Sequence, residues 1–412
     1  MQHPDASNLL RAEAELVLEE SRRQKAEKTK TLGSPIEIPG KALGIEIRGN
    51  NAWIAENTAV ARKLDLETGK TLQLFRGHSA PVTSLAFFDR ATGSGVDGIL
   101  ITGSWDKTIK LWDTETKECL STTPAHTDFV KALLVIPSCH LLVSAGSDKV
   151  IRLWDLSTCQ KGQPLRCVGS ISAHTRPAAC LCAHEISDTE CVLYTADTMG
   201  IIKVWKLTKE ADQAAGWRST LQEELTYHRT RINEMLYGHG QLWTASSDET
   251  VRVIQHPTPA ATSSSPSTKP IPPITHPVAV KAILPLSLTP LSEPYVLTGA
   301  GDIIRVYDVS SLDEPELLCE TDAHWHDVTA LRLWMRHTPI EGNPGLFKRE
   351  PWIVSASLDG TIRKWRLAEL LNPPAKSEDI AKPVVTAPAL KENTYKMSEE
   401  EERELAELMA ED

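Results

Sequence analysis

Residues 99–113, ILITGSWDKTIKLWD, share a pattern with residues 141–155, LLVSAGSDKVIRLWD. Each stretch begins with an apolar run, turns at a polar segment that contains an Asp, and ends in Trp-Asp. In both, the turn Asp precedes the Trp by six positions, and a hydroxyl residue precedes the Trp by ten. With an upstream His, the matching residues are His78, Thr102, Asp106 and Trp112, then His126, Ser144, Asp148 and Trp154. Self-similarity at this period indicates an array of supersecondary units.

The residue types of this unit suit a strand–turn–strand hairpin. Val and Ile alternate with polar residues, which is typical of half-buried strands. An Asp in a tight turn can hydrogen-bond to its own backbone and hold the hairpin closed. A His, a hydroxyl, an Asp and a Trp indole at these spacings suit a buried hydrogen-bonded chain, which satisfies groups that are costly when unpaired.

The two stretches resemble the WD-repeat family, whose members fold as β-propellers of four-stranded blades. The resemblance implies that the His, the hydroxyl, the Asp and the Trp form a polar chain within a blade. It also implies a function, because members of this family generally bring other proteins together as scaffolds.

Five further copies extend the pattern along the chain. One is complete, with His324, Ser355, Asp359 and Trp365 in register. In the fourth copy Met199 occupies the Asp position and Asp197 is displaced by two residues, so the polar chain is in doubt there. The column at the Trp position reads Leu64, Trp112, Trp154, Trp205, Ile254, Tyr307 and Trp365. The sequence therefore predicts an all-β fold, a single propeller of seven four-stranded antiparallel blades with an N-terminal helix and an acidic C-terminal helical tail.

The expected organisation has four parts and one closing strand. Closing a propeller removes exposed strand edges, and members of the family often do so by adding an N-terminal strand to the last blade. Residues 35–39, bracketed by prolines, are the expected closing strand, with 384–385 as the rival. Insertions are expected at 89–98, 183–190, 208–217 and 336–350. The parts are a helical extension (1–32), the propeller (33–370) with a disordered loop at about 257–273, a Pro-rich linker (371–396) and an acidic helical tail (397–412).

Both terminal segments leave two interpretations open. The N-terminal helix either lies against the propeller or frays, or it docks on a partner as a short coiled coil. Its apolar stripe, which includes Leu16 and Val17, is too short for a coiled coil and favours the first interpretation. The C-terminal segment begins with a capping box at Ser398 and Glu401. It is either a solvated acidic tail or a motif that folds into a partner's groove.

Composition bounds the class of protein. The net charge is −11, and residues 391–412 alone carry nine acidic and three basic residues, so the remainder implies no general nucleic-acid affinity. No apolar run is long enough for a membrane span, and the polar N-terminus does not read as a secretory signal. Eight cysteines without a paired framework favour reduced thiols. We therefore expect an intracellular protein of the cytoplasm, the nucleus or both.

Motifs of catalysis are weak or absent. Residues 93–98 match G-x-G-x-x-G, but a strand rather than a helix follows them, so a hairpin loop is the better interpretation. The sequence contains no His-Glu-x-x-His, no Cys/His set with zinc spacing and no G-x-S-x-G elbow. The histidines recur once per blade boundary, which indicates a structural role. We expect neither an enzyme nor a bound cofactor or metal.

Large or charged side chains on one face of the propeller are the expected partner-binding residues, because a turn does not need them for its geometry. Trp105 is the clearest, since the same slot holds Ser147, Ser247 and Gly301 in other copies. Aromatic and Arg side chains are enriched at binding hot spots. For any one of them, packing against a neighbouring blade is the competing interpretation. The set comprises Trp105, Phe129, Arg176, Arg229, Arg231, Trp325 and His326.

Three functions are weighed. The first is a non-catalytic scaffold that binds other proteins within an intracellular complex, and a reader of a protein or histone tail fits the same features. The second is a substrate receptor of a cullin-type ubiquitin ligase. Such relatives often carry an Arg two residues after Trp-Asp, where this chain has Glu115, Ser157 and Thr208. The third, an enzyme built on a propeller, lacks site chemistry.

Overall fold

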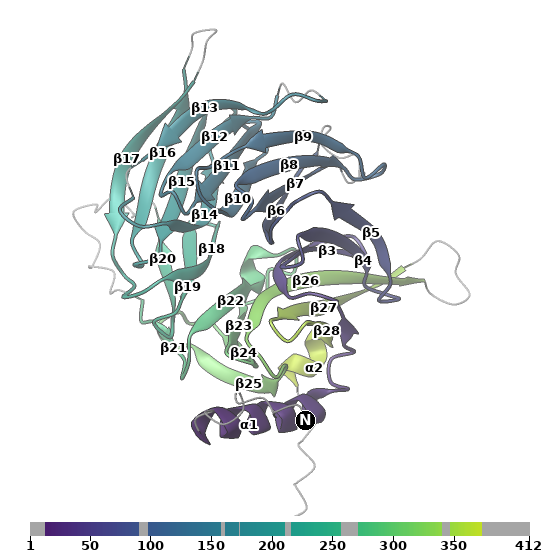
Figure 1. The fold of residues 1–412 in the computed structure, drawn as a ribbon. Helices are drawn as coiled ribbons and strands as arrows, with labels where there is room; N and C mark the ends of the chain where they lie inside the picture. Colours follow the sequence, from purple (N-terminus) through teal and green to yellow (C-terminus); the bar gives the residue numbers. More distant parts are fainter. Residues whose placement is uncertain are drawn as a thin grey trace, which may run out of the picture. The chain divides into compact units, whose positions relative to one another are not determined.

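The stretch ILITGSWDKTIKLWD folds as the hairpin β7 (Ile99–Ser104) and β8 (Thr108–Asp113) in the middle of a four-stranded sheet. The computed structural model describes residues 13–89, 98–157, 161–172, 174–210, 216–256, 271–339 and 347–372. Their strands form seven four-stranded antiparallel sheets, the blades (Figure 1). All of them belong to one compact unit, Met1–Asn372.

The blades are numbered along the chain, and the strands of each are given from the innermost outward. Blade 1 contains β2 (Ala42–Arg48), β3 (Asn51–Glu56), β4 (Val60–Asp65) and β5 (Thr71–Arg76). Blade 2 adds β6 (Val82–Phe88) and β9 (Cys119–Pro124) to the hairpin above, and blade 3 contains β10 (Val130–Ile136), β11 (Leu141–Gly146), β12 (Ile151–Asp155) and β13 (Arg166–Ile171). Blade 4 contains β14 (Ala178–Glu185), β15 (Glu190–Asp197), β16 (Ile202–Lys209) and β17 (Trp217–Leu225).

The remaining blades follow the same order. Blade 5 contains β18 (Ile232–Gly238), β19 (Gln241–Ser246), β20 (Thr250–Gln255) and β21 (Ile274–Thr275). Blade 6 contains β22 (Val280–Pro285), β23 (Tyr295–Ala300), β24 (Ile303–Asp308) and β25 (Glu316–Asp322), with the single-turn helix η2 (Leu286–Leu288). Blade 7 contains β26 (Val328–Pro339), β27 (Phe347–Ser357), β28 (Thr361–Arg366) and β1 (Ile36–Glu37).

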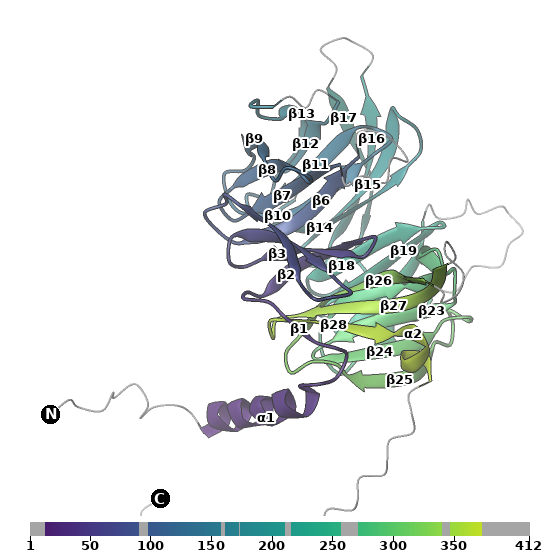
Figure 2. The same ribbon diagram turned by 90° about the vertical axis from the view of Figure 1, so that its right-hand side faces the viewer.

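The ring closes between the first and last blades. Each innermost strand contacts the innermost strand of the next blade, and β26 contacts β2. Strand β1 forms the outer edge of blade 7, with Ile36 opposite Ile362 and Glu37 opposite Thr361 (Figure 2). The closing strand therefore lies within the expected residues 35–39.

Every blade repeats one irregularity of its inner strand. The register between the first and second strands shifts within the first three residues of the innermost strand, as between Val130 and Ala132 in blade 3. A β-bulge bends a strand and redirects side chains locally. In blades 2 to 7 the bulge lies where the innermost strand leaves the loop that carries the blade's His, so it helps to orient that loop.

The aromatic residue at the Trp position packs towards the preceding blade. Trp112 of blade 2 lies in one cluster with Trp53 and Phe75 of blade 1. Trp154, Trp205, Tyr307 and Trp365 likewise join the core of blades 2, 3, 5 and 6. Leu64 joins the core of blade 7 across the closure. The residues that end each repeat thus provide the apolar contact between neighbouring blades.

Two of the expected insertions extend hairpins. Strands β14 and β15 continue to Glu185 and from Glu190, so half of residues 183–190 are paired. Strands β26 and β27 pair as far as Pro339 and Phe347, so both described ends of the predicted connection 336–350 are strand. A hairpin can be lengthened by adding residue pairs without changing its inner register, which the repeat spacing cannot distinguish from a loop.

Helix α1 (Glu13–Thr29) lies against blades 6 and 7 at its C-terminal end. Lys25 Nζ forms ion pairs with Asp302 Oδ2 at 2.7 Å and Asp322 Oδ1 at 2.9 Å. Arg363 of β28 donates to the carbonyl oxygens of Thr29 and, at 3.0 Å, Leu32. These contacts agree with the first interpretation of this helix, in which it lies against the propeller.

The chain next passes through Gly33, and the blades end at a short helix. Gly33 has a φ of +66°, and a Cβ there would come within 2.6 Å of the Trp365 ring, so only glycine suits this crossing. Helix α2 (Leu367–Leu371), which the sequence did not predict, buries Leu367 and Leu370 in the core of blade 6. The loop at 257–270, the linker from 373 and the tail at 397–412 lie outside the described residues, as do 384–385 and residues 1–12.

Candidate partner-binding face

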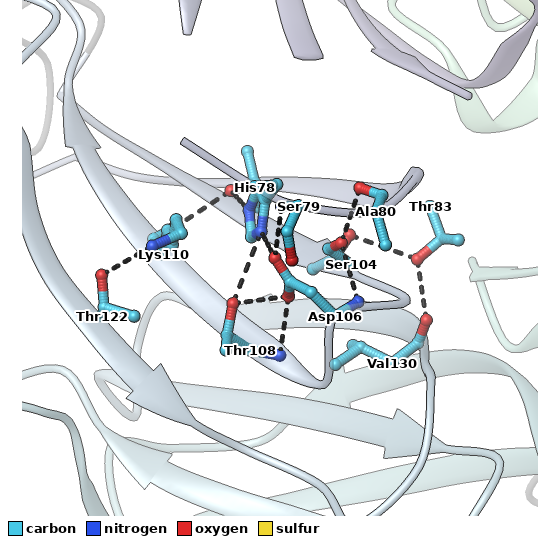
Figure 3. Close-up of polar contacts among 12 residues, drawn as sticks. His78, Ser79, Ala80, Thr83, Ser104, Asp106, Thr108, Lys110, Thr122 and Val130 are labelled. Atoms are coloured by element: carbon cyan, nitrogen blue, oxygen red, sulfur yellow. Dashed lines mark hydrogen bonds and ion pairs between the residues drawn. The ribbon is translucent and has the colours of Figure 1, made fainter. Parts of the chain in front are cut away.

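In blade 2 the expected polar chain is complete, and Figure 3 shows the part of it around His78, Asp106 and Thr108. The Trp112 indole N–H donates to Thr102 Oγ1 at 2.8 Å, and that hydroxyl lies 2.7 Å from His78 Nε2. His78 Nδ1 lies 2.7 Å from Asp106 Oδ2. Asp106 also accepts the Thr108 hydroxyl at 2.6 Å. One chain of side chains therefore ties the loop before β6 to the turn between β7 and β8.

Blades 3 and 7 repeat this chain with Ser in place of Thr. In blade 7, His324 lies 2.8 Å from both Asp359 Oδ2 and Ser355 Oγ, and Trp365 donates to the same hydroxyl at 2.9 Å. In blade 3 the chain comprises His126, Ser144, Asp148 and Trp154, with distances of 2.8–2.9 Å.

Blades 4, 5 and 6 keep the chain in altered form, and in blade 4 Trp205 still donates to Thr195 at 2.9 Å. In blade 4, Asp197 reaches within 3.5 Å of His174 Nδ1 despite its displacement, and it accepts the backbone N–H of Met199 at 2.8 Å. Blade 5 retains His228, Thr244 and Asp248 without the Trp. In blade 6, His276 contacts Thr298 at 2.9 Å, and its Nδ1 has no partner among the described residues.

Blade 1 replaces the hydroxyl and the Trp of the chain with apolar residues. Ile54 stands at the hydroxyl position and Leu64 at the Trp position, and both are buried in one cluster with Ile38. Thr58 stands at the Asp position and donates to Glu56 Oε2 at 2.8 Å. Replacing all partners of a buried polar network with apolar groups can be nearly neutral in free energy, whereas removing one partner is costly. Because the hydroxyl and the Trp are replaced together, neither leaves a buried partner unpaired in the first repeat.

The electrostatics hold these chains in one protonation state. Burial raises the pKa of Asp359, but hydrogen bonds and charge from His324 and the hydroxyl of Thr361 bring it down to about 2. Asp148 and Asp248 behave in the same way. Burial lowers the pKa of His324, and Asp359 opposes that shift. Burial likewise lowers the pKa of His126 and His228. In blades 3, 5 and 7 the carboxylates are therefore charged and the imidazoles neutral near pH 7, which suits a structural rather than a proton-transferring role.

Two of the predicted partner-binding residues come together at the mouth of the ring. Trp105, in the turn after β7, stacks on Phe129, in the loop before β10, with ring centroids 5.1 Å apart and an interplanar angle of 20°. Each ring remains 38% exposed. Trp105 and Phe129 belong to adjacent blades, so the pair packs between the blades and also remains exposed to solvent.

Lys131 completes this pair, and sequence reasoning missed it. Its Nζ lies 5.3 Å from the centroid of Trp105 and 5.7 Å from that of Phe129. Burial lowers its pKa, the charge of Arg231 lowers it further, and Asp128 opposes both. The signal in the sequence is a Lys directly after Val130 at the start of an inner strand.

The remaining predicted residues are distributed around the same face. Arg176, Arg229 and Arg231 are exposed in the loops before β14 and β18. Trp325 and His326 form a separate, partly buried pair with centroids 5.8 Å apart, before β26. The His326 ring accepts the backbone N–H of Asp327 at 2.7 Å, so part of its role is local.

A cavity of about 650 Å³ runs between the inner strands, and Trp105, Lys131 and Arg231 are among the residues that line it. Deeper inside, Arg332 of β26 donates to Glu234 of β18 at 2.7 Å, and its other terminal nitrogen lies 3.6 Å from Glu46 of β2. Burial raises the pKa of Glu234, and the charge of Arg332 opposes that shift. These charges join blades 1, 5 and 7 across the ring.

Other kinds of site are not found in the parts of the chain that the structure describes. No helix there is long and apolar enough to cross a membrane. No group of three His, Cys, Asp or Glu side chains there is arranged to hold a metal. The seven cysteines among these residues are all free thiols.

Comparison with known proteins agrees with the fold. The family model described as "WD domain, G-beta repeat" matches residues 69–113 and 117–155. An uncharacterized WD repeat-containing protein of Schizosaccharomyces pombe is 28% identical over 99% of this chain and 100% of its own length.

Two further relatives match locally. A Lissencephaly-1 homolog of Dictyostelium discoideum is 40% identical over 27% of this chain and 25% of its own length. A WD40 repeat protein of Penicillium oxalicum is 38% identical over 20% of this chain and 25% of its own. The chain therefore has the seven four-stranded blades of a WD40-repeat β-propeller and the His–hydroxyl–Trp chains described above, and its sequence is similar to that family.

Proposed function

We propose that this protein is a non-catalytic scaffold, which binds another protein through the face that carries Trp105 and Phe129. The observation that carries the proposal is the exposure of two stacked aromatic rings, each 38% exposed, on a face whose turns need no aromatic residue. Rigid aromatic side chains supply much of the binding free energy of protein interfaces. WD40 propellers are usually non-catalytic. The chain's recurring histidines form hydrogen bonds that hold each blade's loop to its turn.

The charge of this face argues against a reader of basic tails. Lys131, Arg229 and Arg231 are cationic, and a Lys-rich histone tail would meet like charge there. The ubiquitin-ligase alternative gains no specific support, because Glu115, Ser157 and Thr208 replace the Arg expected of such receptors.

The experiment is affinity purification of the tagged full chain beside a Trp105→Ala/Phe129→Ala double variant. Phe347→Ala is the matched control, because Phe347 is 58% exposed at the start of β27 and belongs to a different surface. We expect the double variant to lose a set of proteins that the wild type and the control retain, with unchanged melting temperatures. Identical sets of captured proteins in all three would refute the proposal, and a cullin with its adaptor among the lost proteins would favour the ligase alternative.

A further inference from the structure

The acidic and the basic residues of this face are treated differently by the fold. Around blades 6 and 7 the acids have cationic partners: Lys25 of α1 pairs with both Asp302 and Asp322, and Lys281 pairs with Asp327. Helix α1 thus supplies a cation to the acidic side of the face.

The basic side has no such compensation. Among the described residues, the side chains of Lys131, Arg176, Arg229 and Arg231 form no ion pair. Asp128 accepts the backbone N–H of Phe129 at 2.8 Å, and it acts on Lys131 through its charge without forming an ion pair. The half-buried Lys131 and the exposed Arg231 act on each other as like charges. Like charges held together without a counter-ion cost free energy that the blades alone do not require.

We propose that this basic side binds an acidic peptide of a partner protein, in which carboxylates flank an apolar side chain. The apolar side chain would contact the Trp105–Phe129 stack, and the carboxylates would pair with Lys131 and Arg231, which line the same cavity mouth as Trp105. The inference deepens the proposed scaffold function and rests on it, because it names the chemistry of the partner.

A peptide fits these residues better than a single-stranded nucleic acid does. Proteins that bind single strands without sequence preference present a groove that follows the backbone and several aromatic platforms for successive bases. Here Trp105 and Phe129 form one stacked pair rather than a row of platforms for successive bases. An Arg or Lys cluster beside one apolar anchor is the arrangement that recognises acidic peptide motifs.

The test is fluorescence anisotropy with the purified full chain and a short fluorescein-labelled peptide in which glutamates alternate with leucines. Lys131→Gln/Arg231→Gln removes the two cations. Lys209→Gln/Arg218→Gln is the matched control, since both residues are exposed at the far edge of blade 4 and removing them changes the net charge equally. Trp105→Ala tests the apolar contact, and melting temperatures check folding.

We expect the wild type and the control to bind the peptide, and the Lys131/Arg231 variant to bind at least about tenfold more weakly. Trp105→Ala should weaken binding by a similar factor, and added salt should weaken wild-type binding because exposed charges are screened. Equal binding by the two double variants, or equal binding of a glutamine-for-glutamate peptide, would overturn the inference. Tighter binding of a labelled uridine oligonucleotide would assign the surface to nucleic acid and overturn it too.

One further arm addresses the chain's own acidic tail. If the peptide binds only when glutamates 399–402 are replaced with glutamine, the occupant is the tail, and the assignment to a partner protein is wrong. The scaffold proposal is tested separately. If Trp105→Ala/Phe129→Ala loses captured proteins while the acidic peptide fails to bind the wild type, the scaffold proposal is supported and the proposal of an acidic partner peptide is refuted.

Discussion

Lys25 of helix α1 lies 2.7 Å from Asp302, the acid in the turn between β23 and β24 of blade 6. The pair attaches the N-terminal helix to the face of the propeller that carries the proposed binding residues. Both side chains are partly exposed, so the contact is of the kind that salt weakens and that contributes about 1 kcal/mol or less.

We therefore predict that Lys25→Ala frees α1 with little change in the melting temperature of the blades. Hydrogen–deuterium exchange of peptides from residues 13–33 should accelerate, and salt should have the same effect on the wild type. Arg23→Ala is the control, because Arg23 pairs with Glu20 within the helix. Equal acceleration in both variants would show that helix propensity, not docking, protects this segment.

The polar chains predict a difference between two identical substitutions. Thr102→Val leaves both His78 Nε2 and the Trp112 N–H without their partner, and should cost about 3 kcal/mol of the free energy of unfolding. Thr298→Val in blade 6 leaves only His276 unpaired, and should cost about 1–2 kcal/mol. Urea unfolding measures both, and an equal or larger loss for Thr298→Val would contradict the chain as described.

The buried histidines predict that stability falls in mild acid. Burial lowers the pKa of His276 to about 4, and Arg305 contributes to the shift. An unfolded His titrates near pH 6.5, so between about pH 6.5 and pH 4 the unfolded chain binds a proton that the folded chain does not. Stability is therefore lost as the pH falls through this window, by up to about 3 kcal/mol from this residue.

We expect His276→Gln to flatten the dependence of the unfolding free energy on pH in that window. His140→Asn is the control, because His140 is exposed and its φ of +50° suits Asn. Urea midpoints at several pH values decide the matter. An unchanged slope in His276→Gln would mean that His276 is not a buried neutral imidazole.

The charges across the ring predict a rescue. Arg332→Met leaves the buried carboxylate of Glu234 without its partner, and should cost about 3 kcal/mol or more. Adding Glu234→Gln removes the uncompensated charge while an amide oxygen can still accept the Ile283 N–H, so part of the loss should be regained. If the double variant is less stable than Arg332→Met alone, Glu234 has a role beyond its charge.

Much of the blade could be predicted because its determinants are local. The turn Asp, the hydroxyl and the Trp of blades 2, 3 and 7 lie within one hairpin, so their spacing along the chain defines their contacts. The contact between Asp197 and His174 was harder to predict, because Asp197 is displaced by two residues and only the shape of the turn brings its side chain to the His. Ile54 and Leu64 show that a repeat can replace both the hydroxyl and the Trp with apolar residues without losing its strands.

The sequence by itself determined the seven blades and singled out Trp105, since strand periodicity and turn chemistry act over a few residues. It favoured residues 35–39 as the closing strand over 384–385, and the pairing of Ile36 with Ile362 decided for the first. Only the tertiary structure decided what lies around Trp105. Phe129 comes from the next blade, Lys131 from an inner strand, and Arg231 lies more than a hundred residues along the chain. Ring closure brings inner strands together regardless of their separation in sequence, so the charge and the aromatic surface of the mouth arise from contacts that no local pattern encodes.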